Sequence, residues 1–175
     1  ASILGRKVEW IPTTREHGWR LLQADLEDFL DNDAGRPRLL ILNYPNNPTG
    51  LSYSRAELQE LALVAEQYKL IVISDEIYGE LNFQGQHVSL AEFYPQGTIV
   101  SGGLSKWCGA GGWRLGTFTF PPDLRWLLQA MAVAASETFT STSAPIQYAA
   151  VKAFEGGPFM DEYLADCRRI LAALG

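Results

Sequence analysis

The sequence has few cysteines, no cluster of basic residues and no long apolar run, and each of these absences excludes a class of protein. Two cysteines, Cys108 and Cys167, in 175 residues are too few for a disulfide scaffold or a cysteine-based zinc site. The formal net charge of −6 argues against nucleic acid or an anionic membrane surface as a partner. The apolar stretches fall well short of the roughly 20 residues of a membrane-spanning helix. We therefore expect a reduced, cytoplasmic protein that binds neither nucleic acid nor membrane.

The composition is that of a folded domain, but neither end of the chain has the character of a natural boundary. Hydrophobic residues make up 47% of the sequence and charged residues 19%, which is enough apolar material to bury a core. The chain begins at Ala1 without a methionine or a signal peptide, and it stops at Gly175 directly after a helical pattern. We expect a segment of a larger domain that is incomplete at both ends.

Strand-like and helix-like segments alternate along the chain. Continuous apolar runs at 38–44, 70–74 and 98–101 predict strands buried on both faces, and 7–11 and 115–120 are two further strand-like segments. Helical spacing of apolar residues, together with a capping box that starts at Ser54, predicts helices over 22–30, from 55 onward, and over 124–139, 144–154 and 158–174. Strands separated by helices predict an α/β fold with a mostly parallel sheet.

Polar segments directly follow three of the predicted strands. They are residues 43–50 (Asn-Tyr-Pro-Asn-Asn-Pro-Thr-Gly), residues 74–79 (Ser-Asp-Glu-Ile-Tyr-Gly) and residues 101–116, which include Ser-Lys-Trp-Cys and Gly-Gly-Trp-Arg. Ligands of parallel sheets bind at the carboxyl ends of the strands. The sequence therefore predicts that amide, carboxylate, phenol, hydroxyl, amine and guanidinium groups converge at one edge of the sheet.

The residue types in these segments point to particular chemistry. Lys106 is one of only four lysines, and its neighbours are Ser, Trp, Cys and Gly, so loss of hydration would favour a neutral, nucleophilic amine that can form a Schiff base with an aldehyde. Arg114, the Ser105 hydroxyl and the glycine-rich loop between them can form a phosphate cradle. Asp75 follows a buried strand, where a protonated ring nitrogen would be a suitable partner.

Taken singly, each of these residues also fits an ordinary structural role. Lys106 and Arg114 can be solvated side chains on a glycine-rich loop, and Asp75 can cap a turn. Tyr78 can belong to the core, and the segment around Asn47 can be a plain tight turn, because Asn, Pro and Gly favour turns. Only their combination distinguishes a functional site from these structural roles.

In combination the groups match the requirements of pyridoxal phosphate (PLP). This cofactor needs an amine for its aldehyde, a carboxylate for its pyridine nitrogen, donors for its phenolic oxygen, and a cation with hydroxyls for its phosphate. The order Asn-x-Pro-Asn-Asn-Pro-Thr-Gly, Asp-Glu-x-Tyr, Leu-Ser-Lys and Gly-Trp-Arg-x-Gly, from Asn43 to Gly116, resembles the class I/II aminotransferases of PLP fold type I. The resemblance implies a three-layer αβα fold in which residues 1–175 form part of the PLP-binding large domain, without its N-terminal strands and the small domain.

The resemblance also implies a role for each matching residue. Lys106 would bind the cofactor as a Schiff base and, once substrate has released it, would shuttle a proton between substrate and cofactor. Asp75 would pair with the pyridinium nitrogen, so that the ring remains an electron sink. The phenolic oxygen would accept hydrogen bonds from Asn47 and Tyr78. Ser105 and Arg114 would hold the phosphate.

One position departs from the family pattern. Many relatives place a phosphate-binding serine three residues before the lysine, where this sequence has Gly103. Ser101 or backbone N–H groups are the expected substitutes, and Ser105 is the carried-over residue that this departure puts most in doubt.

The remaining conspicuous side chains are expected to be structural. His17 and His87 lie in polar, loop-like stretches and are predicted to be solvated, so we expect no metal site. Trp107 and Trp113 are predicted to pack the lysine loop rather than to bind a ligand.

The sequence thus predicts a segment of a PLP-dependent aminotransferase, which in the complete enzyme acts on amino acid and 2-oxo acid substrates. Two alternatives stay open at this point, namely another fold-type-I PLP enzyme (a lyase, decarboxylase or synthase) and a non-catalytic aminotransferase-like domain of a regulator. The resemblance further implies a homodimer. The isolated 175-residue chain is expected to be inactive.

Overall fold

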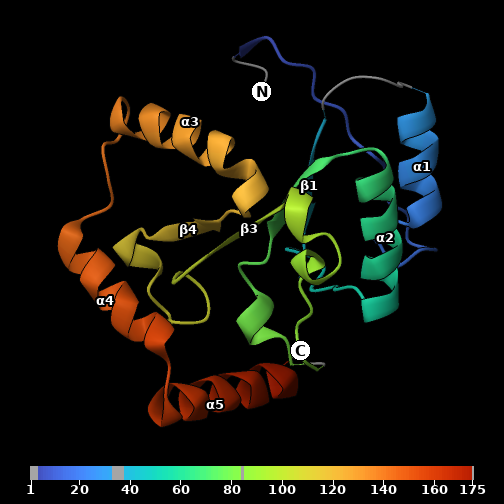
Figure 1. Cartoon of the computed structure of the whole chain (residues 1–175). Helices are drawn as coiled ribbons and strands as arrows, with labels where there is room; N and C mark the ends of the chain where they lie inside the picture. The colour runs from blue at the N-terminus through green and yellow to red at the C-terminus, as the bar shows by residue number, and fades with distance from the viewer. Residues whose placement is uncertain (1–3, 33–37, 84, 175) are drawn as a thin grey trace.

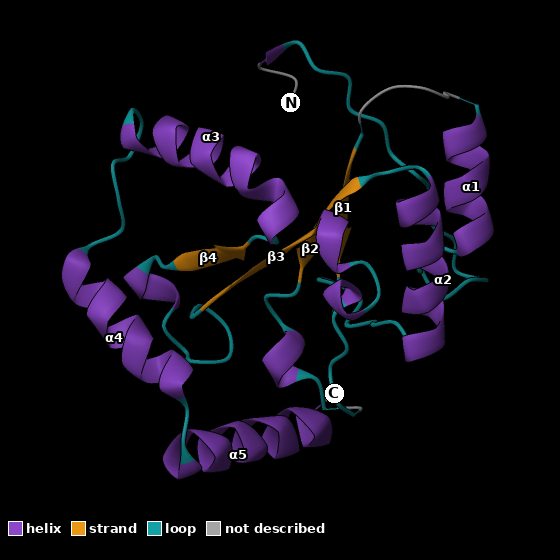
Figure 2. Cartoon of the chain, in the orientation of Figure 1, coloured by secondary structure: helices purple, strands orange, loops and turns teal. Residues whose placement is uncertain are grey.

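The computed structural model describes residues 4–32, 38–83 and 85–174. These residues form four strands and five α-helices, joined by loops and short 3₁₀ helices; Figure 2 shows their arrangement. The strands and helices in chain order are α1 (Gln23–Asp31), β1 (Leu39–Asn43), α2 (Arg55–Gln67), β2 (Ile71–Asp75), β3 (Thr98–Gly103), β4 (Gly116–Thr119), α3 (Arg125–Ser136), α4 (Ala144–Glu155) and α5 (Pro158–Leu174).

The four strands form one sheet in the order β1-β2-β3-β4. The first three are parallel, and β4 runs antiparallel to β3. The register pairs Asn43 with Asp75 and Asp75 with Ser101, so the last residues of β1 and β2 lie beside Ser101, two residues before the end of β3. The expected α/β fold with a mostly parallel sheet is confirmed.

The larger of two apolar clusters lies between the sheet and the first two helices. It combines Leu42 and Val72 from the strands with Leu58 and Val64 from α2 and Leu26 from α1, all of them buried. Figure 1 shows α2 beside β1 with α1 outside it, whereas α3 and α4 lie on the β4 side and α5 runs along the bottom of the view. Burial of these side chains is the main contribution that holds α1, α2 and the parallel strands together.

The opposite face of β1 is open. Leu39 and Ile41, which alternate with the buried side chains of β1, are 55% and 66% exposed. Helix α3 contributes no buried residue. Within the described residues, helices therefore cover this strand on one face only.

A second apolar cluster supports the loop that follows β3. Leu104, Trp107 and Leu115 from the loop pack with Ala150 of α4 and Leu164 of α5. The Trp107 ring lies 5.6 Å from that of Phe154, centroid to centroid. Helices α4 and α5 thereby hold the lysine loop against the end of the sheet.

Most boundaries of the helices and strands agree with the sequence predictions to within one or two residues. The capping box at Ser54 is present. The Ser54 hydroxyl accepts from the Glu57 N–H at 3.3 Å, and the Glu57 carboxylate accepts from the Ser54 N–H at 2.7 Å. Two predictions about these elements and their packing are wrong. Residues 7–11 form no strand, because they pair with none of the described strands and most are exposed. Trp113 is half exposed rather than packed under the loop.

Replacing Leu58 by alanine in the full-length protein should lower the free energy of unfolding by about 2–5 kcal/mol, because this fully buried side chain would leave a cavity between α2 and the sheet. Leu63→Ala removes the same atoms from the same helix at a side chain that is 58% exposed, and it should cost less than about 0.5 kcal/mol. Urea denaturation of both variants measures the difference. Equal losses would contradict the assignment of the core.

Candidate functional site

The site begins with the two residues that end β1 and β2. Asn43 and Asp75 are register partners, and the Asn43 side-chain amide donates to Asp75 Oδ2 at 3.0 Å and to the Asp75 carbonyl at 3.2 Å. Both side chains are partly buried. The amide holds the carboxylate in one orientation at the edge of the sheet, with carboxylate lone pairs left for a further donor.

The turn after β1 is tied to the same asparagine. The Asn43 side-chain carbonyl accepts from the Asn46 side chain at 3.2 Å and from the Asn47 N–H at 3.4 Å. Asn47 Nδ2 in turn donates to the Tyr78 hydroxyl at 3.3 Å. Segments that are 31 residues apart in sequence therefore meet at the Asn47–Tyr78 contact.

Lys106 approaches from the third strand end. Its Nζ lies 5.2 Å from the centroid of the Tyr78 ring, which is a cation–π arrangement. Asn47, Tyr78 and Lys106 are thus linked in one row. The expectation that Lys106 is desolvated is not met, because its side chain is exposed, although Leu104 and Trp107 on either side of it are buried.

The lysine loop is closed by its own backbone. Gly109 N–H donates to the Lys106 carbonyl and Ala110 N–H donates to the Leu104 carbonyl, both at 3.2 Å. Ser105 lies in this closed turn and is partly buried. The loop is compact and packs on the second apolar cluster, which fixes the backbone that carries Lys106.

Gly103 cannot be replaced by a residue with a side chain. Its φ of +151° is one that residues with a Cβ rarely adopt, and a Cβ there would lie 2.7 Å from the Leu115 carbonyl oxygen. The close pairing of Gly103 with Gly116 across β3 and β4 causes this contact. A serine side chain three residues before the lysine would therefore clash, which leaves Ser101, Ser105 and backbone N–H groups as the local donors.

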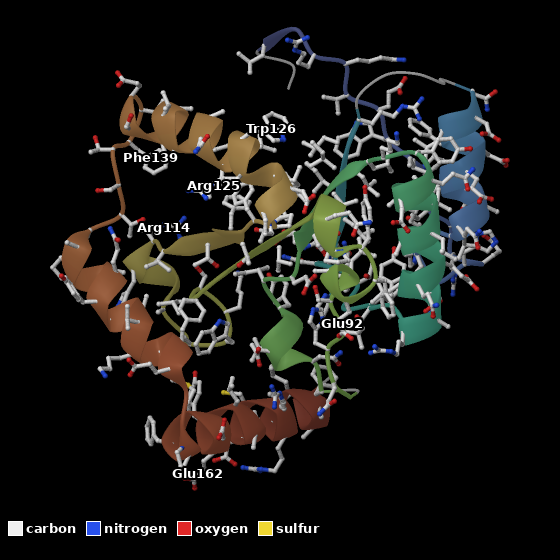
Figure 3. The ribbon with its side chains drawn as sticks, viewed as in Figure 1. Glu92, Arg114, Arg125, Trp126, Phe139 and Glu162 are labelled. Atoms are coloured by element: carbon white, nitrogen blue, oxygen red, sulfur yellow. The ribbon has the colours of Figure 1, made fainter. Side chains whose placement is uncertain are left out.

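Arg114 lies at the end of the loop in a left-handed conformation, with φ +57° and ψ +44°. Its guanidinium donates to the Gly111 carbonyl at 2.9 Å, and the side chain is exposed. Figure 3 shows Arg114 near β4 and α4. The structure thus joins Asn47, Tyr78 and Lys106 through direct contacts, whereas the Arg114 guanidinium bonds to its own loop.

Sequence reasoning assigned no role to Asn43, although this residue connects the Asp75 carboxylate with the Asn47 turn. Its position at a strand end was a usable signal, but the pairing with Asp75 depends on the sheet register. The prediction that His87 is solvated is wrong. Its ring is 18% exposed and Nε2 lies 2.7 Å from Oε2 of the buried Glu76, because the fold returns the polar loop to the end of β2.

The same residues fit the donor set that pyridoxal phosphate requires. Lys106 offers the amine, Asp75 a fixed carboxylate, and Asn47 and Tyr78 a pair of hydrogen-bonding groups. In the part of the chain that the structure describes, no group of His, Cys, Asp and Glu side chains is arranged to hold a metal ion. No helix among the described residues is long and apolar enough to cross a membrane.

Comparison with known sequences places the chain in one family. The model of the family "Aminotransferase class I and II" matches residues 1–174. The chain is 32% identical to the aspartate aminotransferase of Bacillus sp. (strain YM-2) over 151 residues, which cover 84% of this chain and 37% of that protein. It is 37% identical over 123 residues to a probable N-acetyl-LL-diaminopimelate aminotransferase of Bacillus subtilis, which covers 70% of this chain and 30% of that protein.

Solved structures agree. The aspartate aminotransferase of Thermus thermophilus, solved with maleate, superimposes with a TM-score of 0.83 at 28% identity, covering 91% of this chain and 40% of that one. The aromatic aminotransferase of Pyrococcus horikoshii gives a TM-score of 0.80 at 32% identity, covering 91% and 42%. The chain spans about two fifths of the length of these proteins. It belongs to the class I and II aminotransferase family.

Proposed function

We propose that this chain is the PLP-binding part of an aminotransferase that transfers an amino group between an amino acid and a 2-oxo acid. The observation that carries the proposal is the convergence of Lys106, Tyr78 and Asn47 beside the Asn43–Asp75 pair at the carboxyl ends of parallel strands. When bound, PLP supplies the electron sink that stabilises a carbanion at the substrate Cα, while the protein supplies binding and orientation.

Lys106 is the group proposed to act on both cofactor and substrate. Its amine would hold PLP through the cofactor's aldehyde carbon, with loss of water, and once substrate has displaced it, Nζ would accept the proton from the substrate Cα as a general base. The closed loop, packed through Trp107 and Leu104, supports this role, because a base that is already oriented loses little entropy when it reaches the transition state.

Asp75 and its neighbours are proposed to hold the cofactor ring. The Asp75 carboxylate pairs with the protonated ring nitrogen, and Asn43 keeps its Oδ2 in place. Asn47 and the Tyr78 hydroxyl would bind the phenolic oxygen, and their mutual contact of 3.3 Å already brings them together. The phosphate is assigned to Ser105, backbone N–H groups of the loop and Arg114, whose guanidinium would leave the Gly111 carbonyl to reach it.

The scope of the proposal follows from the length of the relatives. Residues 1–175 are proposed to form part of a PLP-binding large domain. Substrate specificity would then depend on this segment and on the rest of a longer protein. Aspartate and aromatic amino acids are the first substrates to test, because relatives named for them share 32–35% identity with the chain. A homodimer in the cytoplasm is part of the same proposal, and exposed apolar side chains on α3 and α4, such as Trp126 and Phe154, offer surface for association.

The proposal is tested by supplying the full-length protein with PLP, an amino acid and 2-oxoglutarate and measuring formation of the corresponding oxo acid. Lys106→Ala should abolish turnover. Lys152→Ala, which removes an exposed lysine that pairs with its helical neighbour Glu155, should leave turnover unchanged. A wild-type protein that binds PLP but yields lyase or decarboxylase products would refute the aminotransferase assignment.

Asp75→Asn in the full-length protein should retain PLP but lower kcat by about a hundredfold, which corresponds to about 2.7 kcal/mol of transition-state stabilisation. The amide keeps the shape of the side chain and its neighbour Asn43, but it cannot balance the positive charge of the ring nitrogen. Steady-state kinetics with Asp161→Asn, an exposed carboxylate on α5, as the control measures the effect. Turnover at the wild-type rate would exclude this role for Asp75.

A further inference from the structure

A second carboxylate follows Asp75 directly and lies in a different environment. The Glu76 side chain is only 7% exposed, and its backbone N–H donates to the Ser101 carbonyl at 3.0 Å, which extends the pairing of β2 with β3 by one residue. The Asp75 carboxylate accepts from Asn43 at the end of β1, whereas the Glu76 carboxylate accepts from the buried Ser74 hydroxyl. None of the proposed catalytic steps uses Glu76, although burying a carboxylate is costly unless several donors satisfy it.

Four side chains satisfy it. Glu76 Oε1 accepts from the hydroxyls of Ser74 and Ser89, each at 2.7 Å, and from the Tyr44 hydroxyl at 3.1 Å. Glu76 Oε2 lies 2.7 Å from Nε2 of His87. Burial raises the pKa of Glu76, but the hydrogen bonds from His87, Ser74 and Ser89 outweigh it and hold the pKa below its usual value. The carboxylate is therefore ionised at neutral pH and accepts from all four donors at once.

His87 connects this cluster to the segment that carries Tyr78. Its ring lies 5.4 Å from the Tyr44 ring, centroid to centroid, and it also lies close to Gly79. A Cβ on Gly79 would lie 2.8 Å from His87 Cδ2, so the close approach requires glycine there. Gly79 is the residue after Tyr78, and its N–H donates to the Glu76 carbonyl at 2.8 Å. The imidazole thus packs against the turn 76–79 at Gly79.

The bond to Glu76 is the hydrogen bond that orients the imidazole. Nδ1 is buried and has no hydrogen-bond partner among the described residues. Because the ionised Glu76 carboxylate is an acceptor, Nε2 is the donor in this bond. Removing the Nε2 donor would therefore release the ring from Glu76 and leave only packing to hold it.

We propose that Glu76 and His87 form a positioning pair that fixes the 75–78 segment, so that Asp75 and Tyr78 meet the cofactor in a single geometry. This inference rests on the proposed function. Neither residue touches the cofactor: Glu76 anchors the backbone next to Asp75, and His87 supports the backbone next to Tyr78. The pair acts on the cofactor only through those two neighbours, which distinguishes it from ordinary core packing.

The test compares His87→Phe, His87→Gln and Gly79→Ala in the full-length protein. Phenylalanine keeps a ring of similar shape but removes the donor, glutamine keeps a donor, and the added methyl group at Gly79 displaces the imidazole without changing it. His17→Phe is the matched control, because that histidine is 44% exposed in the side chain and makes no contact with the site residues described above.

Three measurements separate positioning from stability. In His87→Phe and Gly79→Ala, kcat should fall by about 10- to 100-fold with KM changed by less than about threefold, because misplaced groups lose orientation rather than substrate binding. The pH midpoint of the visible absorption of PLP bound at Lys106 should move by at least about half a unit, because the environment of the phenolic oxygen changes. In the protein without PLP, backbone amides of residues 76–81 should exchange faster with solvent.

His87→Gln should recover most of these changes, and His17→Phe should show none. A lowered thermal midpoint with unchanged absorption midpoint, kcat and amide exchange in the His87→Phe and Gly79→Ala variants would overturn the inference and leave a purely structural role. If the wild-type protein forms no visible complex with PLP, the proposed function fails, and amide exchange of residues 76–81 still decides whether the pair fixes this segment.

Discussion

The candidate site depends on the parallel register of β1, β2 and β3, which brings Asn43, Asp75 and Ser101 side by side. The side chain of Asn43 then reaches the Asp75 carboxylate on one side and the Asn47 turn on the other. A shift of β1 by one residue would turn Asn43 to the opposite face of the sheet, because side chains alternate along a strand. Both contacts would be lost together, and with them the link between the first two motifs.

Two neighbouring carboxylates at the end of β2 lie in different environments and have different proposed roles. Asp75 lies at the open end of the sheet and is available to a cation, whereas Glu76 is enclosed by hydroxyls and the His87 imidazole. In the proposed arrangement the partly buried Asp75 meets the ligand, while the enclosed Glu76 fixes the backbone next to it. The lysine loop has a similar division, with exposed Lys106 between buried Leu104 and Trp107.

Local sequence patterns were sufficient for the elements and for the site residues that follow strands directly. The apolar run at 38–44 and the capping box at Ser54 predict β1 and α2, because both signals lie within a few residues. His87 could not be placed in this way, since its partner Glu76 is 11 residues away and its neighbour Tyr44 is 43 residues away. The strand-like pattern at 7–11 failed for the converse reason, because a strand forms only when another strand pairs with it.

The central claim is that Lys106 binds the cofactor beside Asp75 and Tyr78. The most direct measurement is borohydride reduction of the full-length protein loaded with PLP, followed by proteolysis and mass-spectrometric mapping of the modified peptide. This account predicts a single pyridoxyl group on Lys106. Modification of Lys7, Lys69 or Lys152 with Lys106 unmodified would contradict it.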